Sequence, residues 1–404
     1  MGYRYQSRTL TTGVDAITGT SGNDTITATN TATSAVLGGL DVVDGGAGTD
    51  TLAIADTATA ATAAFSLPAG FTVKNVETLK VTTNGSLGDD ASAATAFNTT
   101  GMTGLTSLEV TTAGDGTTDT SIITADTTDV TLTASAAQDV DVLGGKVVSV
   151  TGGATGSTIT GAALTSVTVK TSGGMTIDNT DTVANGSTTA VGTTLKSVTL
   201  DAVDSNTAIK GKAIDTLTLK NATASTNTVT ITNATAAHSL TLNVDGTGYD
   251  ATAAAQTQTV ADAQAKSLTI NATGAKSNIA FTTGGTNTVL TNATITGSAA
   301  LIVDFDSTNN TKLASIDGSA ATGNLTLNNT AVATTIKTGA GDDKFTATVV
   351  GTTKATVDSG AGADIVTLAG GLVAGSTVNL GAGNDTLLGT TVVAASTATA
   401  VTCH

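Results

Sequence analysis

The sequence contains no tryptophan, one proline, one cysteine and only 2% aromatic residues. The single cysteine, Cys403, excludes an internal disulfide framework. A core without large rings must be built from small side chains, and 39% of the 404 residues are hydrophobic, which is enough to form one. Threonine, alanine and valine are abundant, and β-branched residues pack well on sheets but lose rotamers in helices. We therefore expect an almost entirely β protein.

Long apolar runs are also missing. No segment approaches the ~18 apolar residues that a membrane helix requires, and the start MGYRYQSRTL has no apolar region typical of a signal peptide. We therefore expect no membrane insertion, and we expect any export to use a route without a cleaved leader.

Catalytic motifs are absent as well. His238 and His404 are the only histidines, so an H-E-x-x-H zinc site is impossible. The sequence has no G-x-S-x-G elbow, no P-loop and no dinucleotide-binding fingerprint. These absences indicate a protein that is not an enzyme. His238 directly precedes an alternating segment, and we interpret it as a surface residue at the edge of a coil.

The charge is strongly acidic and consists almost entirely of aspartate. The chain has 16 Lys and Arg against 32 acidic residues, a net charge of -16, and its only glutamates are Glu77 and Glu109. Aspartate favours turns and is a hard oxygen ligand for Ca²⁺, whereas glutamate is common in helices. Because binding to nucleic acids and anionic membranes depends on Lys and Arg, neither is an expected partner.

A short cassette of alternating apolar and Thr or Ser residues recurs at irregular intervals. This alternation is typical of a strand with one buried face. The copies are VETLKV (76–81), LTSLEV (105–110), TDVTLT (128–133), LTSVTV (164–169), LKSVTL (195–200), IDTLTL (214–219), HSLTLNV (238–244) and KSLTI (266–270).

Two architectures are compatible with these cassettes. Tandem immunoglobulin-like sandwiches need about 100 residues each and usually a buried aromatic anchor. A parallel β-solenoid needs only one or two strands per coil of roughly 20 residues, and each coil covers the apolar face of the last. The short period and the scarcity of aromatic residues favour the solenoid. Its Thr and Asn side chains are expected to stack as ladders at the ~4.8 Å strand spacing.

Glycine-aspartate motifs near the N-terminus predict calcium sites. The segment GGAGTDTLA (45–53) matches the nine-residue calcium-binding repeat G-G-x-G-x-D-x-U-x of RTX proteins. Glycines allow left-handed backbone that exposes carbonyl oxygens, and the aspartate supplies a carboxylate. Two aspartate pairs, Asp15 with Asp24 and Asp41 with Asp50, have the same nine-residue spacing. Because one turn supplies too few oxygens for a Ca²⁺ ion, we interpret each pair as two turns stacked beside each other. The candidate ligand positions are Asp15, Asp24, Asp41, Asp44, Gly45, Gly46, Gly48 and Asp50.

A second series lies near the C-terminus and has a fixed step of 21 residues. This step predicts three turns stacked on one edge of a solenoid, with a Ca²⁺ cage in each of the two gaps. In the three copies of the repeat, the first glycine of G-G-x-G-x-D is replaced by Thr338, Ser359 and Leu380 in turn. Weaker candidates are TAGDGTTD (112–119) and NVDGTGYD (243–250). The candidate ligand positions are Gly339, Gly341, Asp343, Gly360, Gly362, Asp364, Gly381, Gly383 and Asp385.

These segments resemble a known family. The runs TTGVDAITGTSGNDTITA (11–28), GGAGTDTLAI (45–54), LPAGFTVKNVETLKVTT (67–83) and GMTGLTSLEVTT (101–112) are similar to RTX-type calcium-binding surface-layer proteins of the Caulobacter type. The resemblance is most specific over residues 11–112 and 336–388. It implies type I secretion without a cleaved signal, binding of many Ca²⁺ ions, and assembly into a two-dimensional lattice on the cell surface.

The predicted fold is an all-β parallel β-solenoid (β-helix) with RTX-like calcium β-roll segments near both ends. The predicted function is that of a calcium-dependent extracellular structural protein at the cell surface, which self-assembles into a surface-layer lattice or a filament. Its expected partner is itself, and cell-surface polysaccharide is a further candidate. The alternative is an RTX-type adhesin or biofilm matrix fragment. The predicted segments are an atypical N-terminus (1–10), a calcium-binding segment (11–56), a Thr/Ala-rich solenoid (57–335), a calcium β-roll (336–390) and a tail (391–404).

Overall fold

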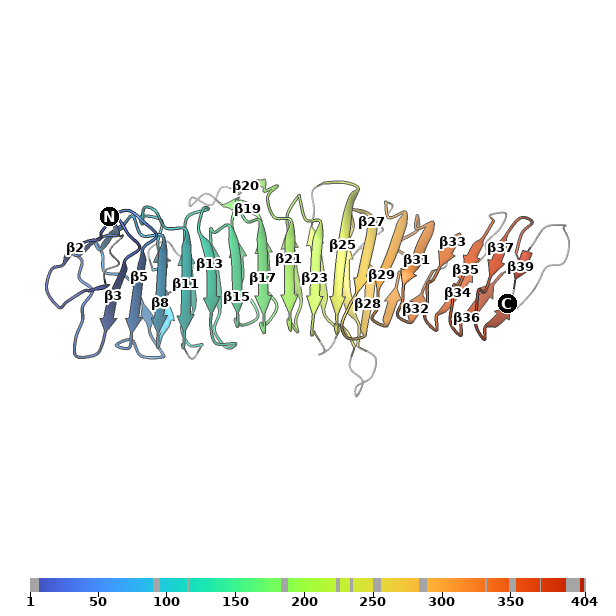
Figure 1. Ribbon diagram of the computed structural model, residues 1–404, viewed down its shortest axis with the longest axis horizontal. Coiled ribbons are helices and arrows are strands. Elements are labelled where there is room, and N and C mark those ends of the chain that lie inside the picture. Colours follow the sequence, from blue (N-terminus) through green and yellow to red (C-terminus); the bar gives the residue numbers. More distant parts are fainter. Residues whose placement is uncertain are drawn as a thin grey trace. The chain divides into compact units, whose positions relative to one another are not determined.

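The fold consists of β-strands joined by turns. The computed structural model divides into two compact units, Met1–Leu195 and Lys196–His404, and contains no helix within the part of the chain that it describes. Figure 1 shows the strands of each unit lying side by side in sequence order. The predicted all-β parallel solenoid is confirmed. The described residues are 7–89, 95–114, 116–182, 188–222, 226–232, 235–249, 256–282, 289–330, 333–348, 354–370, 372–389 and 400–402.

The main sheet of the first unit is a parallel ladder in which each strand pairs with the next. The pairing is in register, as between Leu79 and Leu108. Between neighbouring strands the chain leaves the sheet and returns, so each strand contributes to one coil of the solenoid. The ladder consists of β1 (Ser7–Thr9), β3 (Thr25–Asn30), β5 (Thr51–Asp56), β8 (Thr78–Thr83), β11 (Ser107–Thr112), β13 (Asp129–Thr133), β15 (Val147–Thr151) and β17 (Ser166–Lys170).

Shorter parallel ladders complete the coils of the first unit. One contains β2 (Ala16–Thr18), β4 (Val42–Asp44) and β7 (Thr72–Lys74), and β6 (Ala64–Phe65) pairs with β9 (Ser86–Leu87). Another contains β10 (Phe97–Asn98), β12 (Thr120–Ile123), β14 (Val140–Leu143), β16 (Thr158–Thr160) and β18 (Thr176–Asp178). The strands β19 (Thr180–Thr182) and β20 (Thr188–Val191) form an antiparallel pair outside these ladders.

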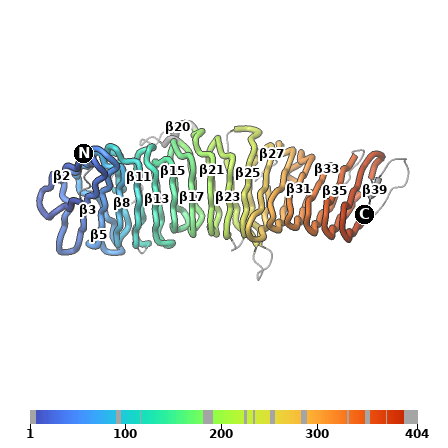
Figure 2. The backbone as a smooth tube through the Cα atoms, in the orientation of Figure 1, coloured from blue at the N-terminus to red at the C-terminus, as the bar shows by residue number. Residues whose placement is uncertain are grey.

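The second unit alternates between two parallel ladders, and each coil contributes one strand to each ladder, except that the described part of the last coil has a strand of the first ladder only. Figure 2 shows these coils following one another within the unit. The first ladder is β21 (Ser197–Asp201), β23 (Thr216–Lys220), β25 (His238–Asp245), β27 (Ala265–Ala272), β29 (Asn292–Gly297), β31 (Ser315–Ala321), β33 (Thr335–Lys337), β35 (Thr356–Asp358), β37 (Thr377–Asn379) and β39 (Ala400–Thr402). The other is β22 (Thr207–Lys210), β24 (Thr228–Thr232), β26 (Gln258–Asp262), β28 (Ser277–Thr282), β30 (Leu301–Asp304), β32 (Leu325–Asn328), β34 (Lys344–Thr348), β36 (Ile365–Ala369) and β38 (Thr386–Gly389).

Columns of aliphatic side chains form the core. In β23 the inward residues Leu217 and Leu219 are 0% and 2% exposed, and Leu217 pairs with Leu242, which pairs with Ile270. Because every coil repeats this alternation, each coil buries its apolar face against the next. Each such side chain contributes roughly 2 kcal/mol through burial. A core of this kind needs few aromatic rings, which agrees with the composition.

Polar side chains form the predicted ladder on the outer face of the second unit. Asn243 Nδ2 donates to Thr218 Oγ1 at 3.2 Å, Asn271 Nδ2 donates to Asn243 Oδ1 at 3.4 Å, and Thr296 Oγ1 donates to Asn271 Oδ1 at 3.3 Å. These four residues lie on successive strands. Their hydrogen bonds satisfy side chains that the parallel register places opposite one another.

Candidate metal sites

The C-terminal aspartate turns stack on one another. Isolated parallel bridges join Ala340 to Ala361 and Ala361 to Ala382, so the turns that follow β33, β35 and β37 lie in register. The amide of Asp343 donates to Asp364 Oδ1 at 2.9 Å, and the amide of Asp364 donates to Asp385 Oδ1 at 3.0 Å, each across 21 residues. The predicted stacking at this step is confirmed. One oxygen of each of these two acceptor carboxylates therefore links its turn to the turn before it.

The second carboxylate oxygens of two of these aspartates lack hydrogen-bond partners. Asp343 is 1% exposed and Asp364 is 0% exposed, and the Oδ2 atom of each is buried without a hydrogen bond. The hydroxyl groups of Thr338 and Ser359 lie beside these carboxylates. Both hydroxyls instead donate at 2.8 Å to carbonyl oxygens of the following coil, those of Ser359 and Leu380. A buried oxygen without a donor is costly and is a position for a cation or a proton.

The electrostatics of this stack favour neutralisation. Burial raises the pKa of Asp343 to about 6, although the amide of Leu325 donates to this carboxylate and the charge of Asp364 adds to the rise. Burial also raises the pKa of Asp364, and the nearby charges of Asp385 and Asp342 act in the same direction. Asp385 lies at the end of the series and is partly exposed. The two buried aspartates are thus the strongest cation candidates of the three.

The glycines of these turns allow close contact between coils. Gly360, Gly362, Gly381 and Gly383 have positive φ, as expected from the motif, whereas Gly339 and Gly341 lie outside the left-handed region. A Cβ atom on Gly381 would lie 1.6 Å from the carbonyl oxygen of Gly360. That carbonyl accepts a hydrogen bond from Ala382 at 2.9 Å. The glycines are therefore required by coil packing, independently of any metal.

The N-terminal acids also stack, but with a different step. The amide of Asp24 donates to Asp50 Oδ1 at 2.7 Å, and the amide of Asp15 donates to Asp41 Oδ1 at 2.9 Å, each across 26 residues. The interpretation of the nine-residue pairs as stacked turns is wrong. Asp15 precedes β2 and Asp24 precedes β3, so these two residues lie at successive corners of one coil. Inserted loop residues lengthen the coil and set the larger step.

The second carboxylate oxygens distinguish Asp50 from its neighbours. Asp50 is 0% exposed, its Oδ2 atom is buried without a partner, and burial raises its pKa. Asp24 Oδ2 instead accepts from the Thr20 hydroxyl at 2.9 Å, and Asp41 Oδ2 accepts from the amide of Gly38 at 2.6 Å. Asp15 Oδ2 is likewise held by a backbone amide, that of Thr11. Within this group, Asp50 has the oxygen available to a cation.

Two further acidic residues, Asp44 and Glu77, belong to the N-terminal turns, and each already has a partner. Asp44 forms an ion pair with Lys74 at 3.0 Å and accepts from Asn75 Nδ2 at 2.8 Å, and these partners lower its pKa. Its charge is therefore already balanced by a lysine. Glu77, which the sequence reasoning did not select, continues the stack because its Oε2 accepts from the amide of Asp50 at 2.6 Å. The signal was its place directly before the strand β8, because Asp50 occupies the same place before β5.

The glycines of the N-terminal motif follow the C-terminal pattern in part. Gly46 and Gly48 have positive φ, and Gly45 lies outside the left-handed region. A Cβ atom on Gly45 would lie 1.9 Å from the carbonyl oxygen of Asn75 and 2.7 Å from Asp50 Oδ2. The unpartnered carboxylate oxygen therefore lies against the glycine backbone of its own turn.

The three unpartnered oxygens fit a hard cation such as Ca²⁺, which takes carboxylate and carbonyl oxygens. The residues that would hold it are Asp50, Asp343 and Asp364, each together with backbone oxygens of its stacked turn. Among the residues that the structure describes, no group of three or more His, Cys, Asp or Glu side chains is arranged around a metal position. Calcium at these turns stays a prediction.

The remaining sequence candidates have other environments. In the segment 243–250, Asp245 Oδ1 accepts from the amide of Ala275 at 2.8 Å, and residue 250 lies outside the described residues. In the segment 112–119, residue 115 lies outside them as well. The interpretation of His238 as a surface residue is wrong. Its side chain is only 10% exposed, and Nε2 lies 2.9 Å from Oδ2 of the buried Asp262.

No protein-family model matches the sequence, and a search of curated protein sequences finds no match. Within the described residues, no helix has the length and apolar character needed to cross a membrane.

Proposed function

We propose that this protein is a calcium-dependent extracellular structural protein that self-assembles into a surface layer, as a lattice or a filament. The observation that carries the proposal is the set of buried, unpartnered carboxylate oxygens of Asp50, Asp343 and Asp364 in stacked glycine-aspartate turns. Calcium would balance these charges and supply the contacts that the oxygens lack. Its binding would therefore stabilise the coil-to-coil contacts of both units.

The solenoid fold supports self-assembly through its strand edges. Within the described residues, β1 pairs only with β3 in the first unit, and β39 pairs only with β37 in the second. The unpaired edge of a terminal strand is a template for pairing with another chain. Calcium would influence assembly through the turns near these strands, because a solenoid is stabilised coil against coil.

The test compares assembly with and without calcium in matched variants. One variant carries Asp50→Asn, Asp343→Asn and Asp364→Asn. The control removes three acidic charges elsewhere through Glu109→Gln, Asp129→Asn and Asp317→Asn. We expect calcium at millimolar concentration to produce ordered sheets or filaments of the wild type and of the control in electron microscopy. The first variant should bind less calcium in titration calorimetry and should not form ordered assemblies.

Two results would contradict the proposal. One is ordered assembly of the wild type that persists unchanged in chelator, which would separate assembly from calcium. The other is a wild type that binds calcium and stays monomeric, which would favour a binding module such as an adhesin.

A further inference from the structure

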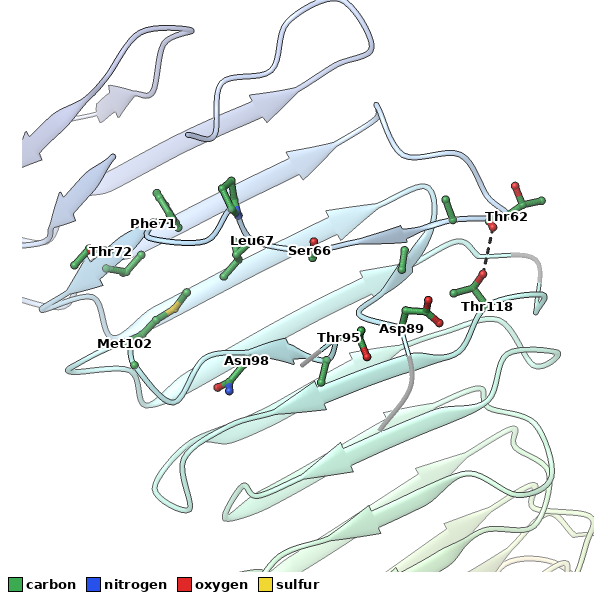
Figure 3. A pocket seen from close by; sticks show the side chains of 16 residues that line it. Thr62, Ser66, Leu67, Phe71, Thr72, Asp89, Thr95, Asn98, Met102 and Thr118 are labelled. Atoms are coloured by element: carbon green, nitrogen blue, oxygen red, sulfur yellow. Dashed lines mark hydrogen bonds between the residues drawn. The ribbon is translucent and has the colours of Figure 1, made fainter. Parts of the chain in front are cut away.

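A groove of about 730 Å³ opens on the first unit, and none of the stacked aspartates lines it. Its two sides come from the segments 62–73 and 95–102, which contain β6 and β10. Figure 3 shows Phe71, Leu67 and Ser66 along one side, and Met102, Asn98, Thr95 and Asp89 along the other. The volume lies in the range of small-molecule sites, roughly 300–1,000 Å³.

The groove has a fixed apolar part. Leu67, Pro68, Phe71 and Met102 line it and are each half-buried, so part of each side chain remains accessible. Backbone hydrogen bonds hold two of them in tight turns: the amide of Phe71 donates to Pro68 at 3.1 Å, and the amide of Met102 donates to Thr99 at 2.9 Å. This surface offers a ring and flat aliphatic groups to a ligand.

Core packing fixes the two sides relative to each other. Phe65 of β6 and Phe97 of β10 are 5% and 1% exposed, and their ring centroids lie 6.2 Å apart. Thr118 Oγ1 also donates to the carbonyl oxygen of Thr62 at 3.2 Å across one end of the groove (Figure 3). The groove is therefore preformed, which reduces the entropy lost when a ligand binds.

The polar rim offers both donors and acceptors. Asn98 Oδ1 accepts from the amide of Thr100 at 2.9 Å and from its hydroxyl at 2.7 Å, which fixes the side-chain amide and leaves its Nδ2 group for a ligand. The exposed carboxylate of Asp89 makes no side-chain hydrogen bond to another described residue and accepts strongly from hydroxyl groups. The hydroxyl of Ser66 is exposed on the opposite side.

These features select the chemical class of the ligand. No Lys, Arg or His is found among the described residues that line the groove, and the chain carries a net charge of -16, so an anionic ligand is disfavoured. A purely apolar ligand would leave the polar rim without partners. A sugar ring has an apolar face and an edge of hydroxyl groups, and it matches both parts of the groove. We propose that this groove binds a neutral saccharide.

The proposal goes beyond the structural function and does not depend on calcium, because none of the stacked aspartates lines the groove. We would measure binding of the full chain to neutral glucose, mannose and N-acetylglucosamine hexasaccharides by calorimetry, with a heparin hexasaccharide as the anionic comparison. At least one neutral probe should bind with a Kd below the millimolar range. Phe71→Ala should weaken that binding at least tenfold, and Asn98→Ala and Asp89→Ala should weaken it several-fold.

The control is Val147→Ser, which removes an exposed apolar side chain on β15 and should leave binding unchanged. Circular dichroism identifies any variant that fails to fold, and the exposed Asn98 and Asp89 keep the test valid if Phe71→Ala does so. The absence of binding to every neutral probe, binding that the groove variants do not weaken, or preference for the heparin probe would each overturn the proposal. Saccharide binding that continues in chelator would separate this site from calcium-dependent assembly.

Discussion

Replacing Asp343 by asparagine should stabilise the metal-free protein at pH 8 and destabilise the calcium-loaded protein. Asparagine keeps the Oδ1 acceptor that receives the amide of Leu325 at 2.7 Å, and it keeps the size of the side chain. It removes only the negative charge of the carboxylate. The second oxygen of that carboxylate, Oδ2, is buried without a partner. Without calcium that charge opposes folding, and with calcium it provides a ligand.

The magnitude follows from the pKa of Asp343. The fold raises this pKa from 3.8 to about 6, which corresponds to about 3 kcal/mol. A raised pKa means that the protonated carboxyl contributes stability that is fully present below pH 3.8 and lost as the pH rises through about 6. At pH 8 the wild type has lost this contribution and asparagine has not. We therefore expect Asp343→Asn to raise the metal-free unfolding free energy at pH 8 by about 1–3 kcal/mol and to change it little at pH 4.

The assay is urea unfolding in chelator at both pH values, with hydrogen exchange of the amides in β34 and β36 as a local measure. Asp317→Asn is a matched control, because the Ser319 hydroxyl and amide lower the pKa of Asp317. Removal of that charge should therefore destabilise the protein slightly at pH 8. Calcium in place of chelator should reverse the sign for Asp343→Asn. The reasoning would be refuted if Asp343→Asn lowered the unfolding free energy at pH 8 in chelator by as much as it does in calcium.

Three further outcomes are expected. Asp364→Asn should lower calcium affinity in titration calorimetry more than Asp385→Asn, because Asp364 is buried between two turns and Asp385 is at the end of the series. Equal affinities of the two variants would contradict this. Gly381→Ala should destabilise the protein by more than about 2 kcal/mol in urea unfolding, since the new Cβ would meet the carbonyl of Gly360 and the φ of residue 381 is +75°. An unchanged urea midpoint would refute the close contact. Ala202→Gly should stabilise the protein by up to about 1 kcal/mol, because Ala202 has a φ of 54°, which is strained for alanine. A lower urea midpoint of this variant would argue against that strain.

The alternating cassettes predicted much of the fold because their period directly reports which side chains are buried. All eight cassettes became strands of the long ladders. The strand β15 was missed because Val147, an outward residue, interrupts the alternation and is 40% exposed. The strand β16, in a shorter ladder of the first unit, has only three residues and gives too few alternations for a pattern.

The candidate site was predictable where the coil length is constant. The 21-residue step placed Asp343, Asp364 and Asp385 in one stack without knowledge of the structure. Near the N-terminus, loops of different length separate the strands, so Asp24 and Asp50 meet across 26 residues and Asp50 and Glu77 across 27. Such a step depends on how each loop folds, and spacing alone does not determine it.

The sequence also did not predict side-chain contacts between residues on different strands. His238 starts β25 and Asp262 ends β26, and their 2.9 Å contact depends on the path of the chain between these strands. The contact matters because the carboxylate offsets the burial of the imidazole, and the net effect raises the pKa of His238. With His404 as the only other histidine of the sequence, the residues around His238 give no signal of such a partner.

The two oxygens of a stacked aspartate have separate roles, and this separation determines what calcium should control. Oδ1 of Asp364 receives an amide of the preceding coil whether or not a cation is present, so the turn keeps its shape when calcium is removed. Oδ2 has no such donor, so the charge of the carboxylate is left without a partner on this side. Loss of calcium should therefore leave the coils folded while weakening the contacts between neighbouring turns. Because terminal strands depend on those contacts, ordered assembly should be lost on removal of calcium while the secondary structure persists.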